Sequence, residues 1–498
     1  MTNSTLGPLG DCVRASHVAV ESIPGVSYPP LEATPFHPDE KYPECPCEHI
    51  AASPNPVYGM VRRVLHGLDL DAARFGTPAW NPFGDLVPAG ARIVVKPNWV
   101  LHHNQAGGGE DCLITHASVL RAVLDYVLLA RPAGVIVGDA PLQGCDFDAL
   151  QALGNRAVID FMKAQGLPVH TEDFRRTILR EEDGLMLVET ELRPETEYVL
   201  VDMATNSLLE PISSDARKFR VTMYDPRKMW KHHSQGLHRY LVAKEVLEAD
   251  LVINLPKLKT HKKAGITAAL KNLVGINGNK DYLPHHRKGP KMLGADNYER
   301  ISLLKAFAEE VLDLANRHMD RPAFYAWCNR LVYCLLVADK RLGGSGEVEG
   351  SWYGNDTVWR MCLDLNRILL YADSKGVLQD KTQRTEISIG DGLVAGEGEG
   401  PLKPEPVSLG AIVAALNPAA ADWVSSFLMG LDPEKIPIIR RAFDSFSFPL
   451  TGFSPSDISC LINGESVSCG RAVTKCGRVF RAPSGWRGHC ELAMEDLP

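Results

Sequence analysis

The stretch from residue 250 to residue 286 reads DLVINLPKLKTHKKAGITAALKNLVGINGNKDYLPHH, and it decides the fold. Its first residues, Leu251 to Ile253, form a short β-branched run between polar residues, which predicts a buried strand ending at Asn254. The residues that follow are expected to form a strongly basic loop, in which Asp281 is the one acidic residue before His286. The basic side chains after Asn254 are Lys257, Lys259, His261, Lys262, Lys263, Lys271, Lys280, His285 and His286. Like charges at this density either face solvent or surround an anion.

Three further short β-branched runs end in a charged residue. These are residues 93–95 before Lys96, residues 135–137 before Asp139, and residues 387–389 before Asp391. Helical periodicity at residues 115–129, with Thr115 as the expected N-cap, and at 147–165 alternates with the strands. This alternation predicts an α/β fold with a mostly parallel, doubly wound sheet, an inserted helical segment and a small C-terminal cap. The glycine-rich residues 392–401 are expected to form a loop.

Changes in composition along the chain divide it into five predicted segments. Proline and glycine are frequent before the first strong strand, where one helix is expected near residues 57–68. Helical spacing dominates residues 301–317, 323–340 and 358–371. The predicted segments are an extended lead-in at 1–88, the first part of the α/β core at 89–297, a helical insertion at 298–375, the second part of the core at 376–430, and a C-terminal cap at 431–498.

The composition argues against nucleic acids and membranes as binding partners. The net charge of −8 over 498 residues does not suit a protein that coats nucleic acid through a basic face. Single-stranded nucleic acid would also need aromatic platforms among the lysines, and Tyr282 is the one aromatic residue between Asn254 and His286. No basic start with an apolar core and no apolar run of about 20 residues is visible. The expectation is a soluble, cytoplasmic protein that binds a small anion, with neither a membrane nor a nucleic acid as partner.

The twelve cysteines include no Cys-x-x-Cys pair. The spacing therefore does not support an iron–sulfur cluster ligated by neighbouring cysteines. Cys45 and Cys47 are close in sequence, but two thiolates are too few ligands for a structural metal site. Most of the cysteines are expected to be buried thiols.

The ends of the predicted strands supply the candidate site. Ligands of doubly wound sheets bind beyond the carboxyl ends of the strands, so these residues are expected to face one crevice. The candidates for ligand binding are Lys96, Asn98, Asn254, Lys257, Lys271, Asn272, Lys280 and His285. The candidates for catalysis are Lys259, His261, Asp139 and Asp391, with His261 transferring a proton and the aspartates acting as general base or metal ligands. Asp139, Asp391 and Asp422 are the candidate ligands of a divalent metal, and the cofactor is otherwise open.

The order of these motifs resembles the family called domain of unknown function 362. The resemblance covers about residues 90–430. It rests on Lys96-Pro97-Asn98, Gly138-Asp139-Ala140-Pro141, Asn254-Leu255-Pro256-Lys257-Leu258-Lys259-Thr260-His261, Lys271-Asn272-Leu273-Val274-Gly275, Lys280 with His285, Asp391-Gly392, and Asn417-Pro418 with Asp422. Many members of the family carry a ferredoxin-like segment with Cys-x-x-Cys spacing, and this sequence shows no such segment.

Three hypotheses about function follow. The first is an enzyme that acts on a small carboxylated or phosphorylated metabolite, with Lys257, Lys259 and Lys271 holding the anion. The second, which the resemblance implies, is a redox or iron–sulfur-associated protein that works with a redox protein partner. The third is a module that binds an anionic polymer, and the scarcity of aromatic residues argues against it.

Overall fold

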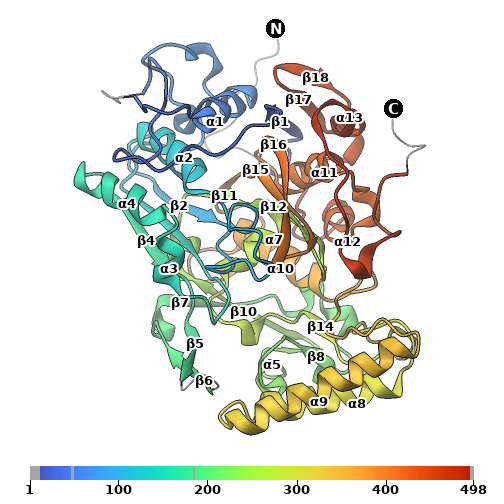
Figure 1. Cartoon of the computed structure of the whole chain (residues 1–498). Coiled ribbons are helices and arrows are strands. Elements are labelled where there is room, and N and C mark those ends of the chain that lie inside the picture. Colours follow the sequence, from blue (N-terminus) through green and yellow to red (C-terminus); the bar gives the residue numbers. More distant parts are fainter. Residues whose placement is uncertain (1–11, 46–49, 183–185, 494–498) are drawn as a thin grey trace.

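One large sheet organises the molecule (Figure 1). The computed structural model describes residues 12–45, 50–182 and 186–493, and Cys47 lies outside these ranges. The sheet has eleven strands, with the main order β18-β17-β1-β16-β15-β11-β2-β3-β4 and with β12 and β13 beside β15. Its strands are β1 (His17–Ser22), β2 (Arg92–Pro97), β3 (Gly134–Asp139), β4 (Val169–Asp173), β11 (Leu251–Leu255), β12 (Lys257–His261), β13 (Gly265–Thr267), β15 (Thr385–Glu399), β16 (Lys403–Ala415), β17 (Ser459–Ile462) and β18 (Glu465–Val467).

The predicted β-branched runs form the parallel centre of this sheet. Strands β4, β3, β2, β11 and β15 are neighbours, and each pair among them is parallel. Ile253 lies between Val95 on β2 and Ile387 on β15. The α/β fold class and the mostly parallel sheet are confirmed. Lys96, Asp139 and Asn254 therefore lie at the carboxyl ends of neighbouring strands, whereas Asp391 lies within β15, three residues beyond Ser388, where the pairing with β11 ends.

Helices cover both faces of the sheet because neighbouring side chains on a strand point in opposite directions. Ile253 packs into one apolar core with α1 (Pro56–Gly67) and α2 (Ala117–Leu129). Val252 packs into the other core with α7 (Ala269–Asn272), α10 (Val358–Tyr371) and α11 (Pro418–Leu428). The remaining helices of four or more residues are α3 (Phe147–Gln151), α4 (Asn155–Ala164), α5 (Pro226–Met229), α6 (Lys244–Glu248), α8 (Leu303–Arg317), α9 (Pro322–Arg341), α12 (Pro437–Arg440) and α13 (Ala472–Cys476).

Two predicted loops are strands instead. Residues 257–261 form β12, which pairs with β15 and with β13, so the basic stretch begins as part of the sheet. Residues 392–399 continue β15, which pairs with β16 along its length despite a register shift between Gly392 and Val394. Glycine suits this strand because a Cβ on Gly396 would lie 2.8 Å from the carbonyl oxygen of Cys112. Close packing of the backbone, and not a turn, explains this glycine.

The prediction that Thr115 caps α2 is also wrong. The N-cap is His116, whose Nδ1 accepts a hydrogen bond from the backbone N–H of Ser118 at 3.2 Å. Thr115 is buried and donates its hydroxyl to the carbonyl oxygen of Leu255 at 2.6 Å. This threonine therefore ties the start of α2 to the end of β11.

The N-terminal segment contributes more than an extended lead-in. The predicted helix near residues 57–68 is confirmed as α1. In addition, β1 lies between β16 and β17, antiparallel to the first and parallel to the second. A short apolar run at residues 18–20 makes this strand, and the abundance of prolines around it hides the signal. The C-terminal segment supplies β17 and β18 at the same edge of the sheet.

The helical segment divides into two parts. Helices α8 and α9 pair with each other around a small core of Ala308, Val311, Ala315, Cys328 and Val332, and they lie at the bottom of Figure 1, away from the large sheet. Helix α10 instead belongs to the main core. Three small sheets lie between these parts: β7 (Tyr198–Asp202) with β10 (Leu237–Ala243) and β9 (His233–Ser234), β8 (Phe219–Arg220) with β14 (His286–Arg287), and β5 (Thr177–Glu182) with β6 (Met186–Glu191). Among the described residues, no helix is both long and apolar enough to cross a bilayer.

Candidate functional site

The ends of β2 and β3 form a buried ion pair. Lys96 Nζ lies 2.8 Å from Asp139 Oδ1, and Asp139 Oδ2 accepts a hydrogen bond from the backbone N–H of Trp99 at 2.7 Å. Burial raises the pKa of Asp139 and lowers the pKa of Lys96. A Cβ on Gly275 would lie 1.8 Å from Asp139 Oδ1, so glycine at this position lets the chain after α7 approach the pair.

Three asparagine side chains join this pair to α7. Asn272 Oδ1 accepts hydrogen bonds from Lys96 Nζ at 3.1 Å and from Asn98 Nδ2 at 2.9 Å. Asn272 Nδ2 donates to Asn254 Oδ1 at 2.8 Å. Lys96, Asn98, Asn254 and Asn272 are therefore brought together as predicted. Because these groups bond mainly to one another and are buried, they fix the position of α7 and of Lys271 beside them.

A second buried ion pair connects β12 with β15. Lys257 Nζ lies 2.7 Å from Asp391 Oδ2, and both side chains are fully buried. Tyr28 donates its hydroxyl to Asp391 Oδ1 at 2.5 Å and accepts a hydrogen bond from Lys257 Nζ at 2.7 Å. His116 donates its backbone N–H to Asp391 Oδ2 at 2.9 Å, and its ring stacks on Tyr28 with the centroids 3.9 Å apart.

Tyr28 and His116 are not among the site residues that the sequence predicts. Tyr28 lies in a proline-rich segment 363 residues from Asp391, and nothing in its local sequence indicates that contact. His116 had a usable signal, because it lies next to the predicted start of α2.

Lys259 lies between the two ion pairs. Its side chain is fully buried, and Nζ contacts the carbonyl oxygen of Leu113. Burial, together with the charge of Lys257, lowers the pKa of Lys259 well below its ordinary value. A lowered pKa makes the neutral amine, which can accept a proton, easier to form at Lys259 than at an exposed lysine.

Five basic side chains form the part of the site that contacts solvent, and we call them the basic site: His261, Lys263, Lys271, Lys280 and His285. All are half-buried except His261, which is buried. Burial lowers the pKa of each of the other four, and the positive charge of Lys271 lowers it further. Burial and the charge of Lys271 lower the pKa of Lys280 to about 7. Within the described ranges, the ammonium groups of Lys271 and Lys280 have no hydrogen-bond or ion-pair partner.

The two histidines of the basic site present different groups. His261 Nδ1 accepts hydrogen bonds from the backbone N–H groups of Lys263 at 3.0 Å and Ala264 at 3.2 Å, which assigns its proton to Nε2. His285 Nδ1 lies 2.7 Å from the carbonyl oxygen of Leu283, which assigns its proton to Nδ1 and leaves the lone pair on Nε2. Burial is the main reason that the pKa of each ring is well below its ordinary value, so both are neutral. One ring can donate a hydrogen bond and the other can accept a proton.

The structure does not bring the three predicted metal ligands together. Asp139 contacts Lys96, and Asp391 contacts Lys257. Asp422 accepts hydrogen bonds from the backbone N–H groups of Ala269 at 2.6 Å and Leu270 at 3.0 Å, and burial raises its pKa to about 7. In the part of the chain that the structure describes, no group of three or more histidine, cysteine or acidic side chains is arranged to hold a metal ion.

Comparison with known proteins gives a family and two distant likenesses. The family model described as "Domain of unknown function (DUF362)" matches residues 178–426, which contain the basic site but not Lys96 or Asp139. A thylakoid-associated protein of Synechocystis sp. (strain ATCC 27184 / PCC 6803 / Kazusa) is 25% identical over 204 residues, which are 41% of this chain and 40% of that protein. The match thus spans about two fifths of that relative. A crystal structure of a Thermotoga maritima protein has 11% sequence identity and a TM-score of 0.31, covering 74% of this chain and 58% of that one.

Proposed function

Because the chain belongs to the family called domain of unknown function 362, whose name assigns no activity, we propose a function from the basic site itself. The protein is an enzyme that binds a small carboxylated or phosphorylated metabolite at the basic site and transfers a proton to or from it. The observation that carries this proposal is the presence of two half-buried ammonium groups, on Lys271 and Lys280, without partners among the described residues. Unpaired charges of the same sign in a half-buried site are destabilising, and a bound anion offsets this repulsion.

The side chains of the basic site have two functions, anion binding and proton transfer. Lys263, Lys271 and Lys280 hold the anionic group, since ammonium groups bind phosphate or carboxylate as point charges. His261 donates its Nε2–H to an oxygen of the metabolite, and His285 accepts the proton at Nε2. A bound anion raises the pKa of His285, because an adjacent negative charge stabilises the imidazolium. Binding therefore prepares this base.

The other predicted catalytic residues act from behind the basic site. Asp139 and Asp391 are engaged by Lys96 and Lys257, and these pairs hold the ends of β2, β3, β12 and β15 in register. Lys259 is a buried amine whose lowered pKa favours proton acceptance from the site. The two aspartates therefore position the strands, and Lys259 is an additional proton acceptor.

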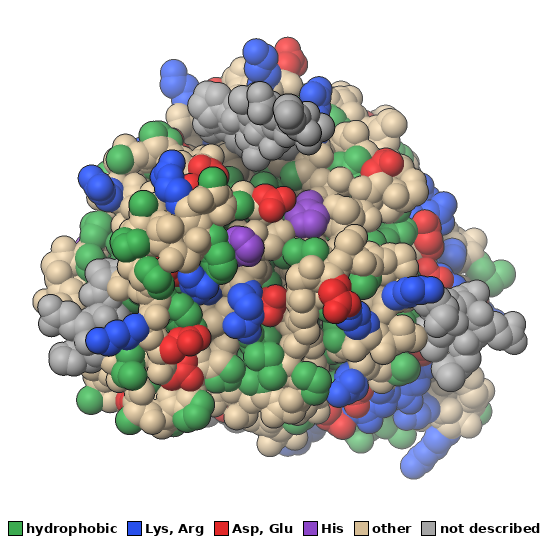
Figure 2. Space-filling model, turned by 90° about the horizontal axis from the view of Figure 1, so that it is seen from above, with side chains coloured by type: hydrophobic (Ala, Val, Ile, Leu, Met, Phe, Trp, Pro, Cys, Tyr) green, Lys and Arg blue, Asp and Glu red, His purple; other side chains and the backbone are tan. Residues whose placement is uncertain are grey.

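The proposal favours a small ligand over an anionic polymer. A polymer needs an extended positive surface. On the face shown in Figure 2, basic and acidic side chains are interspersed and form no continuous positive area. The basic site is a compact group of five residues, which suits a single anionic group with a short body.

A charge-deletion experiment tests the binding step. Isothermal titration calorimetry with inorganic phosphate and with malonate should show binding to the native protein that Lys271→Gln weakens about tenfold or more, because a hydrogen bond to a charged group contributes about 1.5 to 3 kcal/mol. Lys262→Gln is the matched control, since Lys262 is in the same stretch but pairs with Glu399 at 3.1 Å. Equal binding by the native protein and the Lys271 variant would refute the proposed anion site.

A second experiment tests the proton transfer. Native mass spectrometry of gently purified protein identifies a retained metabolite, whose exchange of hydrogen for solvent deuterium is then followed by nuclear magnetic resonance. His285→Gln should slow this exchange at least a hundredfold while leaving the affinity within about threefold. Unchanged exchange would remove His285 from the reaction. The redox hypothesis is not proposed, because no contact among the described residues favours it.

A further inference from the structure

A cavity lies next to the basic site without sharing a residue with it, since Asn355 in its lining donates to the carbonyl oxygen of His285 at 2.9 Å. Its volume is about 760 Å³, within the range of about 300 to 1,000 Å³ that is common for small-molecule sites. It opens between the segment from Arg287 to Ala295, the segment from Tyr353 to Trp359, and the region around α12. Arg287, Lys291, Lys435, Arg440 and Arg441 line it, whereas Asp356 and Glu434 are its acidic side chains. The lining is therefore strongly cationic.

Arg287 at the wall of this cavity has unused donors. The residue is 9% exposed, and its Nη1 donates to the carbonyl oxygen of Gly294 at 2.9 Å. Its Nε is 3.6 Å from Asp296 Oδ2 and its Nη2 is 3.7 Å from Asp356 Oδ2, both beyond hydrogen-bond distance. The buried Nε has no hydrogen-bond partner among the described residues. Such a donor is costly to leave unsatisfied.

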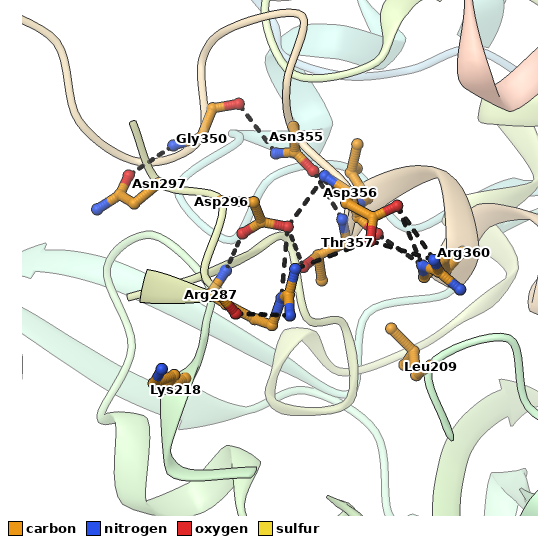
Figure 3. Close-up of polar contacts among 12 residues, drawn as sticks. Leu209, Lys218, Arg287, Asp296, Asn297, Gly350, Asn355, Asp356, Thr357 and Arg360 are labelled. Carbon is orange, nitrogen blue, oxygen red and sulfur yellow. Dashed lines mark hydrogen bonds and ion pairs between the residues drawn. The ribbon is translucent and has the colours of Figure 1, made fainter. Parts of the chain in front are cut away.

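The acidic neighbours of Arg287 pair with it at long distance and accept shorter hydrogen bonds from other groups, as Figure 3 shows. Asp296 Oδ2 accepts hydrogen bonds from the Thr357 hydroxyl at 2.5 Å and from the backbone N–H of Asp356 at 3.0 Å. Asp356 pairs with Arg360 at 3.1 Å. The guanidinium of Arg287 is therefore held in place by its surroundings. Its Nε is buried toward Asp296, so the donors left for a ligand are those of Nη1 and Nη2.

Two cations of the lining are unpaired among the described residues. Lys291 and Arg440 are exposed, and neither side chain has a hydrogen-bond or ion-pair partner in the described ranges. Lys291 Nζ lies 5.6 Å from the centre of the Trp352 ring. Lys435 and Arg441 are already engaged by Asp432 and Asp444. The free positive charge of the lining thus comes from Lys291 and Arg440, and Arg287 adds the N–H donors of its two Nη atoms.

We propose that this cavity binds a metabolite that carries a diphosphate group. A guanidinium matches phosphate oxygens with two parallel N–H donors. Lys291 and Arg440 can offset the charge of two linked phosphates, and the Nη atoms of Arg287 can donate hydrogen bonds to the phosphate oxygens. The cavity has room for an organic body beside the diphosphate. The inference does not depend on the basic site, because the two groups of cations share no residue.

Titration of the full chain with inorganic pyrophosphate tests this site. Binding should weaken at least tenfold in Arg440→Gln, whose exposed side chain can be changed without disturbing the core. Arg287→Lys, which keeps the charge but removes the planar fork, should weaken it at least fivefold. Arg341→Gln, an exposed cation at the end of α9, is the control for general electrostatics and should stay within twofold.

The basic-site variant distinguishes the two proposals. Lys271→Gln should bind pyrophosphate at this cavity as tightly as the native protein does. If Lys271→Gln abolishes pyrophosphate binding and Arg440→Gln leaves it intact, the diphosphate belongs to the basic site and the inference fails. It also fails if the native protein does not bind pyrophosphate, or if Arg440→Gln and Arg341→Gln have equal effects.

Discussion

Lys280 makes the basic site sensitive to pH near neutrality. Its pKa is about 7, so the side chain is charged below that pH and neutral above it. We expect the affinity for sulfate, whose own charge is constant over this range, to fall up to about tenfold as the pH rises from 6 to 8. Calorimetric titrations at pH 6, 7 and 8 measure this dependence.

The matched variant for this prediction is Lys280→Gln. It should bind sulfate more weakly at pH 6 and with little change between pH 6 and pH 8, because the titrating group is gone. A Lys280 variant with the same pH dependence as the native protein would show that another group controls it.

The backbone at Gly275 packs directly against the buried ion pair of Lys96 and Asp139. We expect Gly275→Ala to lower the free energy of unfolding by about 3 kcal/mol or more, because the added Cβ would lie 1.8 Å from Asp139 Oδ1 and 2.8 Å from Lys96 Nζ. Urea unfolding monitored by circular dichroism measures the loss. Gly144→Ala is the control, because a Cβ there would meet nothing within 4 Å. A loss equal to that of the control would mean that the pair moves aside at little cost.

At the residue scale, local sequence predicts the groups that end parallel strands. Lys96, Asp139 and Asn254 follow β-branched runs, and the parallel sheet necessarily places such ends at one edge. Tyr28 could not be predicted, because only the folded chain brings it to Asp391. The roles of the asparagines also needed the structure. The sequence does not distinguish an asparagine that orients a neighbouring side chain from one that binds a ligand.

At the element scale, the sequence wrongly predicts loops where β12 and the second half of β15 form strands. Lysines alternate with other residues in β12 and glycines with glutamates in β15, and both patterns resemble a loop because neither carries an apolar face. Long-range pairing overrides this local preference, since β15 is fixed on one side by β16 and on the other by β11 and β12. The helices α8, α9 and α10 were predictable because their apolar spacing is long and regular.

A buried ion pair joins α8 to β8, in addition to the hydrogen bonds that Glu309 of α8 accepts from Gly289, Asn297 and Tyr298. Arg220 Nε and Nη2 donate to the two oxygens of Asp313 at 2.8 and 2.9 Å, and Lys288 Nζ lies 2.7 Å from the same carboxylate. We expect Asp313→Asn to increase amide hydrogen exchange in residues 303–341, because removal of one partner leaves a buried charge uncompensated. Exchange in β11 should not change. Mass spectrometry of the exchanged peptides measures the deuterium uptake of both regions.

Glu310 provides the control for α8. Its carboxylate also pairs with Lys288, at 2.7 Å, but its side chain is 67% exposed. Glu310→Gln should leave the exchange of residues 303–341 within experimental error, because exposed ion pairs contribute little. Equal exchange in the two variants would mean that the other contacts of α8 hold the helices.

At the scale of the whole molecule, the strands nearest the two ends of the described chain meet at the same edge of the sheet. A fragment of residues 89–430 contains the predicted core but lacks β1, β17 and β18, so one edge of β16 would lose its partner. We expect this fragment to aggregate, because an unpaired strand edge recruits other chains. Size-exclusion chromatography of the fragment and the full chain at equal concentration compares them. A monomeric, folded fragment would contradict the expectation.

The position of β1 between β16 and β17 also sets the order in which the protein can be completed during synthesis. The first strand leaves the ribosome early, yet its two neighbours follow about 400 residues later. At about 5 to 20 residues per second, β1 waits for tens of seconds with both edges open. We expect a strand exposed for that long to be a binding segment for chaperones.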